Sequence, residues 1–325
     1  MSRTGWVYAG LGALLLAAPA LGVYPVFMMK ALCFALFACA FNLLIGFTGL
    51  LSFGHAAFLG SAGYAAGVAI KFWGFPTELG ILFAVLVSGL LGWLVGSLAI
   101  RRQGIYFSMI TLALAQMLFF FCLQAKFTGG EDGLQGIPRG TLLGLIDLSS
   151  DLTIYYVVLA IFFLGFGLIY RTIHSPFGQV LKAIRENEPR AISLGYEVDR
   201  YKLLAFVLSA ALSGLAGATK VVVLGFATLS DAHWSMSGEV VLMALLGGLG
   251  TVLGPVVGAF IVVSLQTKLG DLGQALKSLT GIEWFSQIGE SVTIVTGLIF
   301  MVCVLAFRKG VVGEIAAFFE RKKTA

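Results

Sequence analysis

Long apolar stretches separated by short polar connections dominate the chain. Each stretch is about 20 residues long, the length of helix that crosses a hydrocarbon core of about 30 Å. We therefore expect an all-α fold, a polytopic transmembrane helix bundle with about eight full spans, forming a single domain over residues 1–325. The expected spans are 5–24, 27–46, 50–70, 79–100, 105–124, 152–170, 201–224 and 288–307.

One apolar run, residues 239–269, fits neither one span nor two. A single helix over this run would be about 46 Å long. The run contains Gly247, Gly248 and Gly250, followed by a Gly254-Pro255 pair, and these residues interrupt helices. We expect a re-entrant hairpin of two short helices, entered from outside, because such broken helices often line transport pathways. One long, kinked helix is the alternative.

The positions of the basic residues predict the orientation. Lys and Arg gather at one set of span ends: Arg101 and Arg102, the loop 171–202, and the tail from Arg308 onward. By the positive-inside rule this set is cytoplasmic, with both termini inside. The opposite ends carry acids, so the two signals agree. The acids are Glu78, Glu131, Asp132, Asp147, Asp151 and Asp231.

The composition is that of a membrane protein and not of a soluble domain. The chain is 59% apolar and 11% charged, far from the roughly one quarter charged residues of a soluble domain. The net charge of +5 resides mainly in the basic span ends, so we expect no nucleic-acid partner.

Motifs for catalysis are missing. We find no nucleotide-binding loop, no metal-ligand spacing and no nucleophile elbow, so we expect no enzyme activity and no cofactor or metal in this chain. Acids lie at span ends, and we expect a pathway without fixed charges, which disfavours an ion-driven carrier. An ATP-independent carrier or channel for a small polar solute stays an alternative, as does a scaffold or receptor without a pathway.

The loop 171–202 predicts a short amphipathic helix. Ser175 and Pro176 form a helix start, and the apolar residues after them recur at helical spacing. A second short helical turn ends at Gly195. Mixed charge favours a helix that docks a cytoplasmic partner, and a helix lying on membrane lipid is the alternative.

The third expected span is rich in small and polar residues. Asn42, Ser52, His55 and Tyr64 lie at membrane depth, where an unpaired polar group is costly. We expect them to face the bundle interior, either as links between helices or along a substrate path, and His55 fits both. Outside, the turn-rich loop 128–138 is either a solvated loop or a contact for an external partner.

Four segments in order resemble the LivM-type permease of branched-chain amino-acid ABC importers. They are 42–67, 129–138, 175–188 with Gly195 and the span after it, and 247–258. Leu50 departs from the family pattern, which often has Gln there. The sister LivH type carries a different His-containing stretch.

The resemblance implies a permease subunit in the bacterial inner membrane that pairs with a LivH-like sister permease. It implies two cytoplasmic ATPases, which would bind the ATP and Mg²⁺, and a periplasmic substrate-binding protein. The expected ATPase-coupling residues are Phe177, Gly178, Lys182, Arg185, Glu186 and Gly195. The expected pathway residues are Asn42, Ser52, His55, Tyr64, Gly247, Gly248 and Gly250.

Overall fold

The structure is a computed structural model that describes residues 3–142, 144, 146–280, 297, 298, 301 and 310–314. Within these residues five helices are long and apolar enough to cross a membrane, and each falls on an expected span. The all-α membrane bundle is thereby confirmed. The five are α2 (Pro25–Thr48), α4 (Thr77–Ala99), α5 (Ile105–Gln124), α6 (Asp151–His174) and α9 (Val198–Leu224).

Three expected spans have a different outcome. Helix α1 (Arg3–Ala17) ends well before residue 24, because Pro19 cannot continue a helix. Helix α3 (His55–Lys71) starts five residues later than expected, after the non-helical segment 49–54. The expected span 288–307 lies outside the described residues, apart from 297, 298 and 301, so the count of eight is not confirmed.

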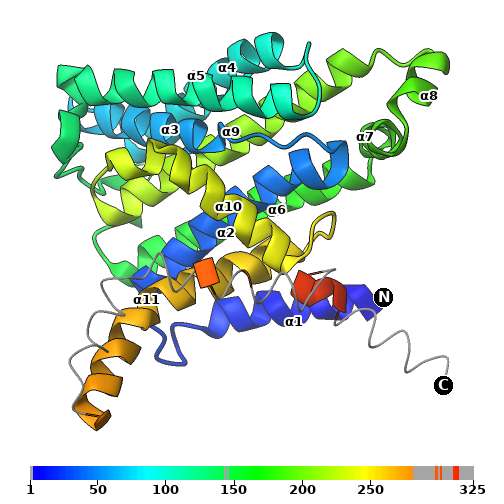
Figure 1. The fold of residues 1–325 in the computed structure, drawn as a ribbon. Coiled ribbons are helices and arrows are strands. Elements are labelled where there is room, and N and C mark those ends of the chain that lie inside the picture. Colours follow the sequence, from blue (N-terminus) through cyan, green and yellow to red (C-terminus); the bar gives the residue numbers. More distant parts are fainter. Residues whose placement is uncertain are drawn as a thin grey trace, which may run out of the picture.

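Helix α2 forms the centre of the bundle. Proline at its first position suits the helix start, and Gly49 ends it in the left-handed conformation at φ 78°. Of its most apolar window, 94% is buried. It packs against α6, α9, α10 and α11, so neighbours surround it on several sides. Figure 1 shows α2 and α6 in the middle, with α3, α4, α5 and α9 on one side and α1 and α11 on the other.

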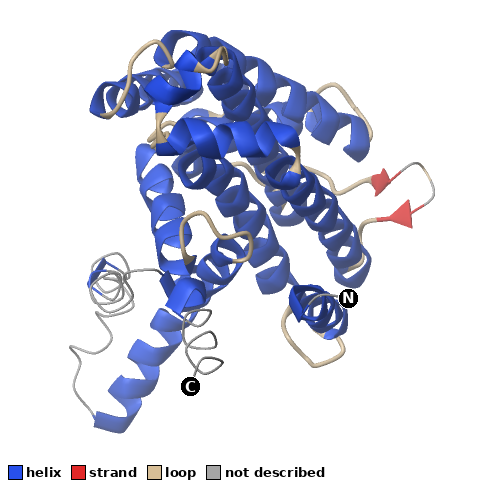
Figure 2. Cartoon of the chain, turned by 90° about the vertical axis from the view of Figure 1, so that its right-hand side faces the viewer, coloured by secondary structure: helices blue, strands red, loops and turns tan. Residues whose placement is uncertain are grey.

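One end of the bundle gathers the connections that we expected outside; we call it the η3 side after the 3₁₀ helix η3 (Leu229–Ala232). Leu134 pairs with Ala227 there, and Lys71 Nζ donates to the Gln135 carbonyl at 2.6 Å. The other elements of this end are η1 (Lys126–Thr128), η2 (Gly130–Asp132) and the projecting hairpin of β1 (Thr141–Leu142) and β2 (Ile146–Asp147), seen in Figure 2.

The opposite end carries α7 (Pro176–Glu186) and α8 (Glu188–Ser193), and we call it the α7 side. The predicted amphipathic helix is therefore present. It covers residues 176–186 and begins directly after Ser175, where the sequence predicted a helix start. Gln103, from the basic turn after α4, donates to Glu188 at 2.9 Å. The connections that we expected on one side of the membrane thus lie together.

The expected break in the long apolar run is present. Helix α10 (Trp234–Gly247) and α11 (Gly254–Thr280) are joined by a turn at 248–253 and pack against each other. A methyl group added at Gly258 would overlap the Met243 carbonyl oxygen, so the two backbones touch. The alternative of one continuous helix is wrong. Helix α11 is longer, at 27 residues, than the short helix we expected.

We expect Gly258→Ala to destabilise the protein by about 1–3 kcal/mol, because overpacking a close helix contact forces the backbones apart. Gly238→Ala, on α10 in open space, is the matched control and should be close to neutral. The measurement is the thermal transition of the detergent-purified protein. Equal transitions for both variants would contradict the close α10–α11 contact.

Candidate functional site

Helix α7 is fixed to the bundle from its first turn. The Ser175 hydroxyl accepts a hydrogen bond from the Gly178 N–H at 3.3 Å, which caps the helix. Gly178 is buried against the Ile173 carbonyl, where no side chain fits. Phe177 stacks on Tyr201 of α9 with ring centroids 5.6 Å apart. Phe177 and Gly178, two of the expected coupling residues, therefore contact other helices of the same chain. They join α7 to α9 and α6.

The charged residues of α7 divide between the bundle and solvent. Arg185 donates through its guanidinium to the Gly46 carbonyl of α2. Lys182 Nζ lies 5.8 Å from the centre of the Phe47 ring, also on α2. Glu186 is exposed. Two of the three expected charged residues thus connect α7 with α2, and the third faces away.

A buried ion pair holds α8 against α9. Lys202 Nζ lies 2.6 Å from Glu188 Oε1, and only 3% of the lysine side chain is exposed. Beyond this pair, the chain turns at Gly195, whose φ of 87° favours glycine. Ile192 and Leu194 are 57% and 68% exposed. Large exposed apolar residues beside a charged helix form a surface suited to a protein partner.

Asn42 clamps the turn between α10 and α11. Its amide oxygen accepts from the Gly250 N–H at 3.0 Å, and its amide nitrogen donates to the Thr251 carbonyl at 2.9 Å. The turn needs glycine: Gly248 has φ 119° and Gly250 φ 75°. Gly247 packs against Gly254 so closely that no side chain fits. The structure thus brings four of the expected pathway residues together.

These contacts form one continuous connection across three elements. Arg185 of α7 binds the Gly46 carbonyl, and Asn42, one helical turn away on α2, binds the turn. A methyl group added at Gly250 would come within 3.2 Å of the Arg185 guanidinium. A displacement of α7 would therefore reach the α10–α11 hairpin through side chains in direct contact.

The segment 49–54 is a second interruption of helix inside the bundle. Ser52 is fully buried there, and its hydroxyl accepts from the Gly54 N–H at 3.2 Å. The Leu51 carbonyl accepts from the Ser108 hydroxyl of α5 at 2.6 Å. Ser52 and Ser108 thus each satisfy one backbone group of this segment, as non-helical backbone at membrane depth requires.

His55 is completely enclosed. Its Nε2 lies 2.9 Å from the Ser209 hydroxyl of α9, which in turn donates to the Ala40 carbonyl of α2. The rings of Phe41, Phe58 and Phe206 surround it edge-on, with centroids 5.1, 5.5 and 5.8 Å away. Of the two roles left open, this arrangement favours the link between helices.

Tyr64 borders a groove of about 850 Å³ between α3, α4 and α5. It is 3% exposed, and its hydroxyl has no hydrogen-bond partner in the described part of the chain. The rest of the lining is mostly aromatic and aliphatic. Tyr64 therefore lies apart from Asn42 and the hairpin turn.

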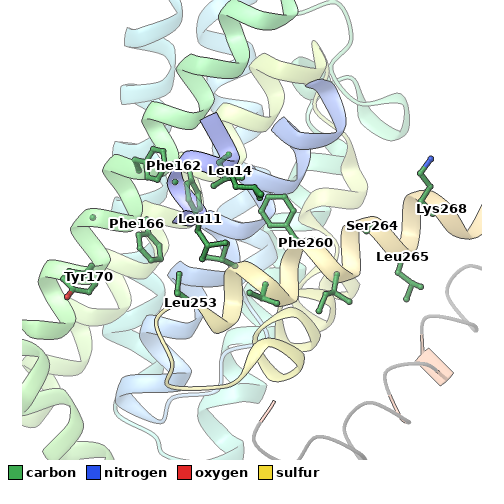
Figure 3. A pocket seen from close by; sticks show the side chains of 17 residues that line it. Leu11, Leu14, Phe162, Phe166, Tyr170, Leu253, Phe260, Ser264, Leu265 and Lys268 are labelled. Atoms are coloured by element: carbon green, nitrogen blue, oxygen red, sulfur yellow. The ribbon is translucent and has the colours of Figure 1, made fainter. Parts of the chain in front are cut away.

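A larger groove of about 950 Å³ lies between α1, α6 and α11. Figure 3 shows Leu11 and Leu14 of α1, Phe162 and Phe166 of α6, and Phe260 of α11 around it. Its wall is almost wholly apolar and contains none of the expected pathway residues. This groove has the character of a surface for apolar chains rather than of a route for a polar solute.

Sequence reasoning missed a group of charges at the η3 side. Lys220 of α9 and Asp231 of η3 form a buried ion pair, each residue being 7% exposed. Lys30 of α2 lies within electrostatic range of both and of Glu239 on α10. Our expectation of a pathway without fixed charges stays a prediction, because this pair joins two elements of the bundle. The available signal was a lysine inside an apolar span, because such charges are rare and costly.

Broken helices and a helical loop fixed to the core define a polytopic α-helical membrane protein of the transport class. A family profile described as "branched-chain amino acid transport system / permease component" matches residues 25–307. The chain belongs to this family.

Individual relatives agree with the family. The chain is 28% identical over 256 residues to the high-affinity branched-chain amino acid transport system permease protein LivM of Salmonella typhimurium, covering 72% of this chain and 60% of that protein. It is 30% identical over 176 residues to the autoinducer 2 import system permease protein LsrC of Klebsiella pneumoniae, covering 52% and 48%. It is 28% identical over 209 residues to the ribose import permease protein RbsC of Bacillus subtilis, covering 60% and 58%.

The resemblance to the LivM type is thereby confirmed. The chain spans about 60% of the length of the LivM proteins of Salmonella typhimurium and Escherichia coli. The relatives named here are permease proteins for different solutes.

We expect a cysteine at Thr251 to react with a maleimide from the α7 side and not from the η3 side. Asn42→Leu should raise this rate and lower stability by about 1–3 kcal/mol, because two partly buried backbone groups of the turn lose their partner. The measurement is labelling in vesicles of both orientations, with Lys71→Cys as the control for the η3 side. Rapid labelling of Thr251→Cys together with Lys71→Cys would contradict this placement.

Proposed function

We propose that this chain is the LivM-like permease subunit of an ATP-driven importer for branched-chain amino acids or similar small solutes. The match to the permease family over residues 25–307 carries the proposal. We place the chain in the bacterial inner membrane, with the α7 side and both termini in the cytoplasm. The distribution of Lys and Arg supports this orientation.

In this proposal the energy source is a partner. Two cytoplasmic ATPase subunits bind ATP and Mg²⁺, a LivH-like sister permease completes the pathway, and a periplasmic binding protein delivers the solute at the η3 side. This chain contributes no catalytic residue and holds no cofactor. Its contribution is to turn movement of the ATPases into movement of the helices that border the solute.

The exposed part of α7 and α8 is the proposed docking surface. Glu186, Ile192 and Leu194 face away from the bundle, so they are available to a partner. Phe177 contacts α9, Lys182 and Arg185 contact α2, and these three residues transmit the movement. The route runs from Arg185 to α2 and through Asn42 to the hairpin turn, where non-helical backbone can rearrange with little loss of helix.

We expect Leu194→Asp to reduce the amount of ATPase that co-purifies with the assembly, because a carboxylate placed in an apolar contact loses hydration without gaining a partner. Leu21→Asp, on an exposed leucine outside α7 and α8, is the matched control. The measurement is the molar ratio of ATPase to permease after affinity purification. An unchanged ratio would contradict docking at this surface.

A second prediction separates docking from coupling. Arg185→Glu should leave the ATPase bound and hydrolysing ATP while uptake falls about tenfold or more, because a charge-assisted contact to Gly46 is lost. Arg171→Glu, an exposed position at the end of α6, serves as control. Uptake and hydrolysis are measured in the same proteoliposomes, and coupled uptake that survives Arg185→Glu would rule out this route.

A further inference from the structure

The turn between α10 and α11 has a second neighbour besides Asn42. This neighbour is the segment 310–314, which begins at Gly310, a buried glycine. A methyl group added at Gly310 would overlap the Cα and N atoms of Gly248 and would lie 3.0 Å from the carbonyl carbon of Gly247. The backbone of the segment therefore touches the backbone of the turn. Figure 1 shows the segment in red, at the end of the hairpin that carries the turn.

Both sides of this contact need glycine. Gly310 has φ 73° and Gly248 has φ 119°, in the region of backbone conformation that residues with side chains rarely adopt. The contact also leaves no room for a side-chain carbon at Gly310. In a membrane protein, small residues permit backbones to approach closely, and the resulting van der Waals contacts hold segments together. Conformation and close approach thus both favour glycine at this point.

The contact lies where the route from α7 ends. Asn42 of α2 binds the turn at Gly250 and Thr251, whereas the segment 310–314 touches it at Gly248. Two separate parts of the chain therefore hold the same turn. A displacement of the turn must break one of these contacts or move the segment with it.

We propose that Gly310 is a positioning residue for transport, because its contact with Gly248 sets the position of the α10–α11 turn. The segment 310–314 then acts on the hairpin independently of the route through Arg185 and Asn42, and it limits how far the turn follows α7. This role rests on the proposed function, in which movement of α7 reaches the helices that border the solute.

The first test measures the turn alone, in vesicles, with the Thr251→Cys chain and a maleimide added from the α7 side. Gly310→Ala should make labelling about tenfold faster, because overpacking a close contact shifts the local opening of the turn by roughly that factor. Gly22→Ala is the matched control, since Gly22 has φ 77° and open space at the position of the added methyl group. It brings similar backbone strain without the overlap. Equal rates in the two variants would overturn the positioning contact.

A pair of shortened chains decides the question where Gly310→Ala fails to fold. Ending the chain after Lys309 removes the segment 310–314, and ending it after Glu314 keeps that segment. The first chain should label faster at Thr251→Cys than the second, because it loses the contact without any added bulk. Labelling at the same rate in both would overturn the proposal.

The second test separates positioning from a merely structural role. It uses the complete assembly with its binding protein and ATPases in proteoliposomes, with radiolabelled L-leucine as the probe. Gly310→Ala should lower the leucine taken up per ATP hydrolysed severalfold relative to Gly22→Ala, because a displaced turn no longer follows α7. A contact that only supports the fold would lower the yield of assembled protein and leave this ratio unchanged, which would overturn the role in transport.

The two tests fail in different ways. Labelling of Thr251→Cys requires neither an ATPase nor a solute, so it reports on the contact whatever the protein transports. If the unaltered assembly takes up no leucine while Gly310→Ala still labels faster, the proposed function is overturned, and the contact between Gly310 and the turn stands. If leucine uptake is normal and labelling does not change, the proposed function stands and the positioning role is overturned.

Discussion

The double hydrogen bond from Asn42 to the turn at 248–253 is the contact on which the arrangement of the helices depends. Non-helical backbone inside a membrane protein must find partners within the protein, because lipid offers none. Asn42 supplies both a donor and an acceptor, to Thr251 and Gly250. Without it two backbone groups of the turn would be left without a partner next to α2.

Close backbone contacts produce a rigid core around this point. Gly217 of α9 meets the backbone of Leu59, and Gly258 of α11 meets that of Met243. In lipid, where apolar burial contributes little to helix association, such contacts supply much of the attraction. The polar links of His55 and Ser209 add to it. A core held this way moves as a unit, so small displacements concentrate at the two non-helical segments.

The two ends of the molecule then have separate tasks. At the α7 side, exposed apolar residues are available to a partner while Arg185 ties α7 to α2. At the η3 side, the buried pair of Lys220 and Asp231 fixes η3 to α9. Helix α2 and the α10–α11 hairpin extend between these ends. A displacement of α7 therefore reaches the hairpin through Arg185, α2 and Asn42.

The sequence by itself determined the class of fold and many element positions, because an apolar run in lipid has helix as its one satisfactory structure. The sequence also predicted the break at Gly247, Gly248 and Gly250 and the helix start at Ser175-Pro176, because these residues act on the local backbone. Only the tertiary structure decided which face of α7 meets the bundle, that residues 49–54 are not helical, and that Lys220 pairs with Asp231. Those outcomes depend on helix rotation and on contacts between distant segments, and no local pattern of residues encodes either.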